Sequence, residues 1–484
     1  MTVVLPTTIR KQVDEAATFV AIRPMHRVAA IAIPLLYLAL VFQRSMQAGS
    51  TVDDGLLIAL TVNVLLRLLP FLWIGRGVGW FHPIVFSAVL GFLDLLRSFD
   101  VYSMGMTSHI ALPGGSDYLN GLLAVQTNMS SIGLVAYYLG YFAGPRLPIV
   151  GKRVRLDATP SMSKRTVYVI VGAALIWFLY IGGPSGIIAH LSQLTSGGSR
   201  SSLAGSYYFL LPIELALAAW WVWFAHVKKI RAVTVAVGAA LSVAHYMTFG
   251  SRSILVYCSL VALVIWGIRR SVFPAGRVLV LALVGTYAIT VLAHFGPVDS
   301  GGALGLSLTE DRSIADTIAT GFSGEISSRA TSGSGSLAIY ANVPESVGYL
   351  NGSSYVAALM LPIPRSLWSG KPGLIDGRVG EAFFGTNSGI PASAAGEAYW
   401  NFGIPGIAGA FFLFGTFHRW LARMVSARRR EAGAIVLYVI ILVFFRSPDS
   451  SSVVSCVQWL ALVLIVMKIG GMVRLKERAA MLRR

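Results

Sequence analysis

Apolar segments long enough to cross a membrane alternate with short loops along this chain, and every second loop is basic. About 20 apolar residues in a helix span the hydrocarbon layer of a bilayer. Hydrophobic residues make up 55% of the 484 and charged residues only 12%, which is about half the usual charged share of a soluble domain. The pattern therefore predicts an all-α polytopic membrane protein.

Windows of low charge give about 12 predicted transmembrane helices. With a cytoplasmic N-terminus, 28 of the 39 Lys and Arg residues lie on the inner side, and every inner loop carries at least one. Basic loops stay in the cytoplasm, so both termini are predicted to be cytoplasmic. The predicted spans lie near residues 28–43, 56–74, 80–96, 121–143, 166–184, 207–225, 231–249, 253–268, 277–295, 397–417, 432–446 and 452–467.

The net charge of +18 is spread along one membrane face. This distribution indicates contact with anionic lipid headgroups and not binding of nucleic acid, which needs a concentrated basic groove. Cys258 and Cys456 both lie in apolar segments, so we expect neither a disulfide framework nor a cysteine metal site. Asp14 and Glu15 interrupt the N-terminal segment, so we expect no cleavable signal peptide. Without an internal repeat, residues 1–484 are predicted to form a single membrane domain.

One outer loop, residues 296–395 between predicted spans 9 and 10, is far longer than the others. Its apolar run 355–361 is too short to cross a membrane and is ended by Pro362 and Pro364, which predicts an interfacial or re-entrant helix. Loops of this length are usually functional. Aromatic residues argue against disorder in its second half: Tyr340, Tyr349, Tyr355, Trp368, Phe383 and Phe384.

Cationic residues recur on the predicted outer face, several of them near a helix end. Arginine in such places suits bidentate binding of a diphosphate at the membrane boundary. The alternative is that each side chain snorkels to the interface or pairs with an acid, as Arg446 could do with Asp449. These residues are Arg200, Arg252, Arg365, Lys371, Arg378 and Arg446.

A carboxylate beside those arginines would take the proton from a sugar hydroxyl as the hydroxyl attacks an anomeric carbon. Glu397 precedes the run Tyr399-Trp400-Asn401-Phe402-Gly403, where the large loop re-enters the membrane, so we predict it as the general base. The competing hypothesis is that Glu397 only holds the loop in place. The other outer or intramembrane candidates are Asp94, Glu214, Asp376, Glu381, Asp449, His109 and His294.

The chain contains no Asp-x-Asp motif, no metal-binding histidine pair and no glycine-rich phosphate loop. These absences argue against a metal-dependent nucleotide-sugar enzyme and against an ATPase. We accordingly predict no metal and no cofactor.

Several stretches between residues 180 and 450, taken in order, resemble the O-antigen polymerase family, the oligosaccharide repeat-unit polymerases of bacterial polysaccharide assembly. An Arg-x10-Gly spacing found in some members appears from Arg378 to Gly389 but not around Arg200, which leaves the role of Arg200 open. The resemblance rests on Gly182-Gly183 with Arg200 and Tyr207-Tyr208, on Gly250-Ser251-Arg252, on Pro364-Arg365 with Trp368 and Lys371-Pro372, on Gly396-Glu397-Ala398-Tyr399 with Asn401-Phe402-Gly403 and Gly406, and on Phe445-Arg446 with Asp449.

The resemblance implies a metal-independent, inverting glycosyltransferase with a GT-C-like polytopic fold in the bacterial inner membrane. Such an enzyme transfers a polyprenyl-diphosphate-linked glycan onto a lipid-linked repeat unit at the outer leaflet, and its partners are membrane lipid, a chain-length regulator and a flippase. Glu397, Arg252 and Arg446 are the expected catalytic residues, because arginines stabilise the departing diphosphate. The expected substrate-binding residues are Arg200, Arg365, Lys371, Arg378, Tyr399 and Asn401.

Two alternatives stay open. A ligase of the same superfamily would share the arginines and the large loop and differ in its acceptor. A transporter or lipid flippase would call for charged residues inside the spans and for repeat-related broken helices. Only Arg67, Asp94 and Glu214 are clearly intramembrane charges, which favours chemistry at the outer face.

Overall fold

The computed structural model describes sixteen stretches of the chain, and the fold, site and contacts below refer to them. They are residues 24–45, 53–72, 79–91, 116–145, 147–148, 154–156, 162–186, 211–227, 229–249, 253–271, 334–360, 368, 370–386, 389–428, 431–471 and 473–475. The regular elements among these residues are helices, apart from one short pair of strands, which confirms the prediction of a helical fold.

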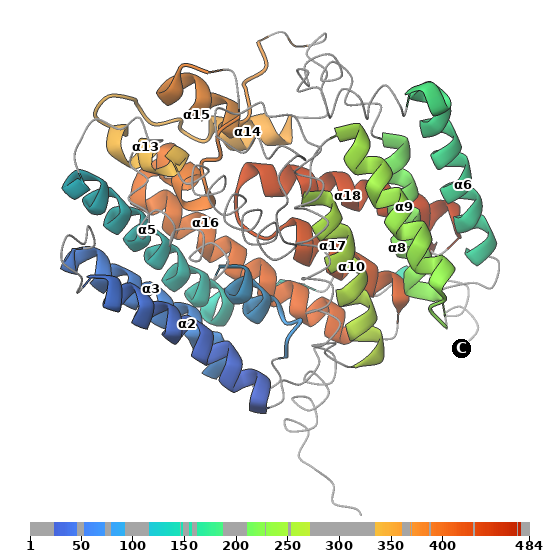
Figure 1. The fold of residues 1–484 in the computed structure, drawn as a ribbon, viewed down its shortest axis with the longest axis horizontal. Helices are drawn as coiled ribbons and strands as arrows, with labels where there is room; N and C mark the ends of the chain where they lie inside the picture. The colour runs from blue at the N-terminus through green and yellow to red at the C-terminus, as the bar shows by residue number, and fades with distance from the viewer. Residues whose placement is uncertain are drawn as a thin grey trace, which may run out of the picture. The chain divides into compact units, whose positions relative to one another are not determined.

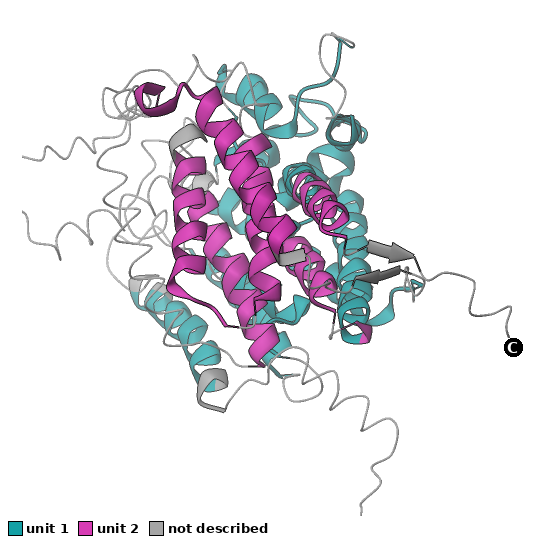
Figure 2. Cartoon of the chain, turned by 90° about the vertical axis from the view of Figure 1, so that its right-hand side faces the viewer, with its two compact units in different colours: residues 1–149, 325–426, 444–456 teal, residues 150–324, 427–443, 457–484 magenta. Residues whose placement is uncertain are grey.

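The chain forms two compact units, shown in different colours in Figure 2. Unit 1 comprises residues 1–149, 325–426 and 444–456, and unit 2 comprises residues 150–324, 427–443 and 457–484. Unit 1 holds α2 (Pro24–Ser45), α3 (Asp54–Leu72), α5 (Ser116–Ala143), α13 (Ser334–Asn342), α14 (Ser353–Leu359), α15 (Ile375–Phe384), nearly all of α16 (Ala394–Ala427) and the first turns of α18 (Ser450–Ile469).

Unit 2 holds α6 (Met162–Tyr180), α8 (Leu211–His226), α9 (Ala232–Phe249), α10 (Ser253–Arg270), most of α17 (Ala432–Phe444) and the remainder of α18. Within it, α8 packs against α6, α9 and α10. The strands β1 (Val154–Leu156) and β2 (Val473–Leu475) pair antiparallel, with Arg155 opposite Arg474. This pair joins the loop before α6 to the segment after α18.

Three helices in the described part of the chain, α3, α16 and α18, are long and apolar enough to cross a membrane. Shorter apolar helices cover residues 28–40, 232–246 and 432–444. Predicted span 277–295 lies outside the described residues, and of span 80–96 residues 80–91 are described, with a helix over 83–91. The number of about 12 spans and the GT-C-like architecture therefore stay predictions.

Helices α5 and α16 approach each other at glycines. A Cβ on Gly140 would lie 1.9 Å from the carbonyl oxygen of Phe412, and one on Gly415 would lie 2.0 Å from that of Tyr137. Small residues let helix backbones meet in this way in membrane proteins. Arg419 of α16 adds hydrogen bonds of 3.0 Å to the carbonyls of Phe142 and Gly144, which end α5. The contact fixes α16, which carries the candidate site.

The second half of the large loop folds onto α16 as α13, α14 and α15, which Figure 1 shows gathered together. Their apolar core contains Ile339 and Val343 from the α13 region, Ile375 and Val379 from α15, and Trp400 from α16. Helix α14 begins two residues before the apolar run at 355–361 that predicts a short helix, so the helix exists. Its position relative to a membrane stays a prediction.

Candidate functional site

Helix α16 is broken at Phe402 and Gly403. Phe402 has φ −145° and ψ 16°, and Gly403 has φ 65° and ψ −152°, a conformation that is essentially restricted to glycine. Pro405 follows and has no backbone N–H, so the carbonyl of Asn401 cannot be used by the next turn of the helix. The break therefore leaves backbone acceptors at the end of the first helical segment.

The turn before α14 takes up those acceptors. The backbone N–H of Leu350 donates to the carbonyl of Trp400 at 2.9 Å, and that of Asn351 donates to the carbonyl of Asn401 at 3.3 Å. The N–H of Gly352 donates to the side-chain oxygen of Asn401 at 2.9 Å. Three successive amides thus tie the large loop to the break in α16.

Glu397 lies one turn before Asn401 and is fully buried. Its Oε1 accepts a hydrogen bond of 2.6 Å from the hydroxyl of Ser354, and its Oε2 accepts one of 2.8 Å from the backbone N–H of Ser450. Asn401 donates through Nδ2 to the hydroxyl of Ser354 and to the carbonyl of Glu397, each at 2.8 Å. The carboxylate therefore joins α14, α16 and the start of α18.

Two more acids gather at the start of α18. Asp449 immediately precedes the helix and accepts a hydrogen bond of 2.6 Å from the N–H of Ser452, which is N-terminal capping. Asp376 of α15 accepts a bond of 3.2 Å from the hydroxyl of Ser451. We call Asp376, Glu397 and Asp449 the acid cluster. The positive end of the helix dipole favours negative charge there.

The surroundings of Asp376 shift its ionisation. Burial raises the pKa of this carboxyl above its ordinary value, the hydrogen bond from Ser451 opposes the rise, and the nearby charge of Asp449 adds to it. Asp376 and Asp449 are both partly buried, whereas Glu397 is fully buried. Both oxygens of Asp449 accept hydrogen bonds from neighbouring serines, so Asp376 is the member of the cluster best placed to exchange a proton with a ligand.

Tyr355 of α14 faces the same charges. Burial raises the pKa of its phenol, and Glu397 and Asp449 raise it further. Its hydroxyl is buried and makes no hydrogen bond within the described part of the chain. The phenol therefore stays neutral and offers a hydrogen-bond donor beside the acid cluster.

The predicted cationic residues are placed as follows. Arg378 of α15 donates from Nη1 to the hydroxyl of Ser353 at 2.7 Å, one residue before the serine that binds Glu397. Arg446 is exposed, four residues before α18. Lys371 is partly buried in the segment before α15. Arg200, Arg252, Arg365, Asp94, His109 and His294 lie outside the described residues.

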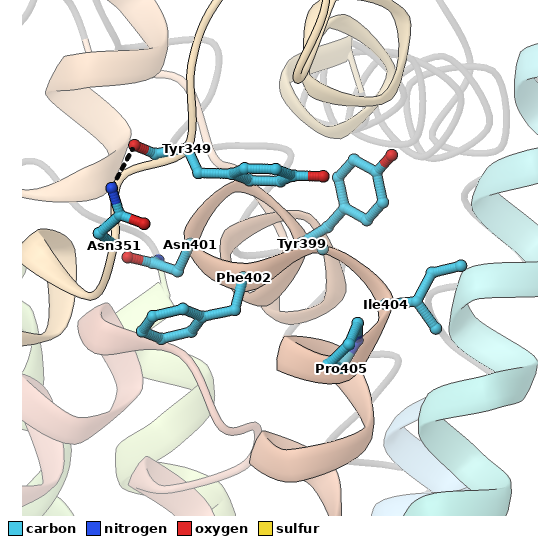
Figure 3. A pocket seen from close by; sticks show the side chains of 8 residues that line it. Tyr349, Asn351, Tyr399, Asn401, Phe402, Ile404 and Pro405 are labelled. Atoms are coloured by element: carbon cyan, nitrogen blue, oxygen red, sulfur yellow. Dashed lines mark hydrogen bonds between the residues drawn. The ribbon is translucent and has the colours of Figure 1, made fainter.

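A pocket of about 440 Å³ opens beside the break, and Figure 3 shows its lining side chains. We call it the aromatic pocket. Tyr349 and Phe402 lie on either side of the neighbouring carboxamides of Asn351 and Asn401, and Tyr399 stands next to Tyr349. The pocket is lined by Tyr349, Asn351, Tyr399, Asn401, Phe402, Gly403, Ile404 and Pro405.

The structure therefore brings Glu397, Arg378, Tyr399 and Asn401 into one region. Asn401 is fully buried with both side-chain amide atoms hydrogen-bonded inside the protein, so it positions the pocket wall. No group of three His, Cys, Asp or Glu side chains suited to a metal occurs among the described residues.

Sequence reasoning did not single out Ser354, the serines 450–452 or Asn351. A signal was present for the serines, because Asp449 followed by three serines is typical of a helix N-terminus. For Asn351, the dipeptide Asn351-Gly352 indicates a turn, which the structure contains. Neither pattern points to chemistry without the tertiary contacts.

No protein-family model, curated protein or solved structure matches this chain.

Proposed function

We propose that the chain is a membrane glycosyltransferase that polymerises lipid-linked oligosaccharide repeat units, as an O-antigen polymerase does. The observation that carries the proposal is the placing of the acid cluster next to the aromatic pocket, with Ser354 and Asn401 hydrogen-bonded between them. Carboxylates for proton removal and aromatic faces for sugar rings are the two features that metal-independent glycosyl transfer needs.

The reaction can be written for the residues of this site. A hydroxyl at the non-reducing end of one repeat unit loses its proton to Asp376 as its oxygen bonds to the anomeric carbon of the other glycan. The bond from that carbon to the diphosphate oxygen breaks, and the electron pair leaves with polyprenyl diphosphate. Arg378 and Arg446 are the proposed cations for the leaving group, because fixed donors stabilise charge that develops in the transition state.

In this proposal Glu397 is a positioning residue. Its carboxylate is fully buried and both oxygens are occupied by Ser354 and Ser450, so it has no acceptor directed at a substrate in this conformation. It aligns α14 and α18, and through them Tyr355 and the remaining acids. This supports the hypothesis that Glu397 holds the loop.

The buried charges give the transporter alternative no specific support, because they have partners within the protein; the break in α16 is one feature that this alternative does call for. Arg67 donates from Nε to Asn63 at 2.8 Å and from Nη2 to Ser130 at 3.2 Å. In unit 2, Glu214 accepts a bond of 2.5 Å from Gln458 and lies 3.5 Å from Nε2 of His245. Charges satisfied in this way serve packing as well as they would serve transport. A ligase shares the proposed chemistry and remains the second candidate.

Purified protein in lipid nanodiscs, supplied only with a polyprenyl-diphosphate-linked repeat unit, tests the proposal. We expect a ladder of longer glycans without nucleotide sugar or added metal, and loss of the ladder in Asp376→Asn. Glu381→Gln is the matched control, since it neutralises an exposed acid of the same helix. A parallel reaction adds a second glycolipid as acceptor. A single transfer to that glycolipid with no ladder would identify a ligase, and no transfer in either reaction would refute both.

A further inference from the structure

The aromatic pocket is built from two segments that hold each other's rings in place. The ring of Phe402 lies on Gly352, where a Cβ would be 3.1 Å from Cζ of Phe402. The hydroxyl of Tyr349 lies on Gly403, where a Cβ would be 3.2 Å away. The loop thus places a ring on a glycine of the helix, and the helix places a ring on a glycine of the loop. Rings fixed before binding reduce the entropic cost of capturing a ligand.

Both rings remain accessible despite this packing. Phe402 is 50% exposed and Tyr349 is 40% exposed, so each presents a face or edge to the pocket. Exposed apolar side chains are common in this protein, so it is their place beside one cavity that makes these two rings a candidate ligand surface.

The polar groups of the pocket differ in their availability. The side-chain oxygen of Asn401 accepts a hydrogen bond from Gly352, and its Nδ2 donates one to Ser354. Asn351 is exposed, and within the described part of the chain its Nδ2 makes a single long contact, 3.4 Å to the carbonyl of Tyr349, the dashed line in Figure 3. A carboxamide offers both donors and an acceptor. Asn351 can therefore bind neighbouring hydroxyl groups that each donate and accept.

The lining also limits the class of ligand. Among the described residues, eight line the pocket. None of these eight carries a charge, and Ile404 and Pro405 are its aliphatic members. A phosphate-bearing ligand would need a cation or a set of free backbone amides, and a lipid chain would need an aliphatic wall. Sugar rings combine an apolar face of C–H groups with an edge of hydroxyls, which matches aromatic rings beside a carboxamide.

We propose that the aromatic pocket is a saccharide subsite that holds a neutral sugar of the acceptor glycan against Phe402 and Tyr349, with its hydroxyls on Asn351. The choice of the acceptor rests on the proposed function, whereas the binding of a saccharide does not. A volume of about 440 Å³ is at the small end of ligand pockets, which span roughly 300–1,000 Å³, so the subsite takes a short stretch of glycan.

The test uses the full-length protein in nanodiscs and three probes free of lipid and phosphate: maltotriose, cellotriose and chitotriose. Saturation-transfer NMR and calorimetric titration compare wild type with Asn351→Ala, Phe402→Leu and the matched control Tyr168→Ala, whose ring on α6 is 72% exposed. We expect at least one trisaccharide to bind, and roughly 3- to 10-fold weaker binding in the two pocket variants, the scale of one aromatic contact. Asn351→Ala alters an exposed side chain, so it reports on binding even if Phe402→Leu folds poorly.

The same variants are assayed for the KM of the acceptor in the ladder reaction. A raised KM in Asn351→Ala and Phe402→Leu with kcat maintained supports the subsite. Trisaccharide binding equal to wild type in both variants, or an unchanged acceptor KM, overturns the subsite and leaves the polymerase proposal standing. Wild-type protein that binds trisaccharide through this pocket but forms no ladder overturns the polymerase proposal and keeps the subsite.

Discussion

The backbone N–H of Ser450, the first residue of α18, donates a 2.8 Å hydrogen bond to Oε2 of Glu397, which lies 53 residues earlier in the chain. The first amides of any helix lack partners within that helix. Here a buried acid from another helix satisfies one of them, and its charge is stabilised by the helix dipole. The start of α18 and the end of the large loop are therefore set by one carboxylate.

Replacing Glu397 by Gln should destabilise the protein. The amide group must face either the N–H of Ser450 or the hydroxyl of Ser354, which also accepts from Asn401, so one charge-assisted hydrogen bond is lost. We expect a loss of about 1–3 kcal/mol and weaker donor binding, measured by thermal unfolding and donor titration. Glu381→Gln, at an exposed acid, should leave both unchanged. Normal stability and donor affinity with turnover lost would instead make Glu397 the base.

The variant Asp376→Asn removes the ionisable group of this side chain and keeps its size, so it shows how ionisation of Asp376 affects stability. The pKa of Asp376 is raised in the folded protein, so the folded state binds its proton more tightly than the unfolded state. Stability from this group is therefore greatest at acidic pH and falls as the pH rises from the unfolded to the folded pKa. We expect the variant to gain melting temperature relative to wild type at neutral pH, with the gain vanishing below the unfolded pKa.

Turnover should change with pH in the direction opposite to this stability contribution, because a general base must be ionised. If Asp376 is the base, wild-type turnover falls as the pH drops through its raised pKa, and Asp376→Asn shows little turnover at any pH. Glu345→Gln changes an exposed acid of the same loop and should keep the wild-type profile. A wild-type pH profile in Asp376→Asn would remove this residue from the chemistry.

Gly403→Ala should disrupt the break in α16. Its positive φ with ψ −152° disfavours any side chain, and the added Cβ would press on the hydroxyl of Tyr349. We expect a loss of about 1–3 kcal/mol. Gly409→Ala in the same helix meets no atom within 4 Å and should be neutral or gain up to about 1 kcal/mol. Equal melting temperatures for the two variants would argue against the broken helix.

Arg446→Ala tests the cation before α18. We expect turnover to drop about 100-fold or more with normal abundance in the membrane, and poor rescue by Lys, which lacks the planar pair of donors. Arg231→Ala, an exposed arginine in a predicted inner loop, should be fully active in the ladder assay. Loss of the protein itself in Arg446→Ala would indicate a structural role.

The pairing of β1 with β2 predicts a cross-link. Arg155 and Arg474 are direct partners, and paired residues in an antiparallel ladder have Cα atoms about 4.5–5.5 Å apart, within disulfide range. Oxidised Arg155→Cys with Arg474→Cys should therefore form an intramolecular disulfide, seen as a gel shift reversed by reductant. Val154→Cys with Val473→Cys is two residues out of register and should form far less, and equal yields would contradict the register.

Hydropathy predicts the helices well because burial in lipid is a local property of each segment. The predicted span 397–417 and α16 nearly share a start, at Ala394 in the structure. The break at Gly403 was not predicted, although Gly403 and Pro405 both mark it, because a window of about 19 residues averages over such features.

The site was predicted only in part, for a related reason. Glu397 and Asn401 stand out where the loop re-enters the membrane, whereas their partners Ser354 and Ser450 are 43 and 53 residues from Glu397. Contacts over such separations depend on tertiary packing and leave no local pattern. The substrate-binding role of Asn401 stays a prediction, and its hydrogen bonds to Gly352 and Ser354 add a positioning role.

The strand pair also constrains how often the chain can cross a bilayer. Backbone groups that hydrogen-bond to each other must lie on the same side, so the segment between Leu156 and Val473 has to make an even number of crossings. Any helix of this segment that turns out not to span must therefore be matched by a second change elsewhere in it. The number of membrane crossings in this segment therefore cannot change by one.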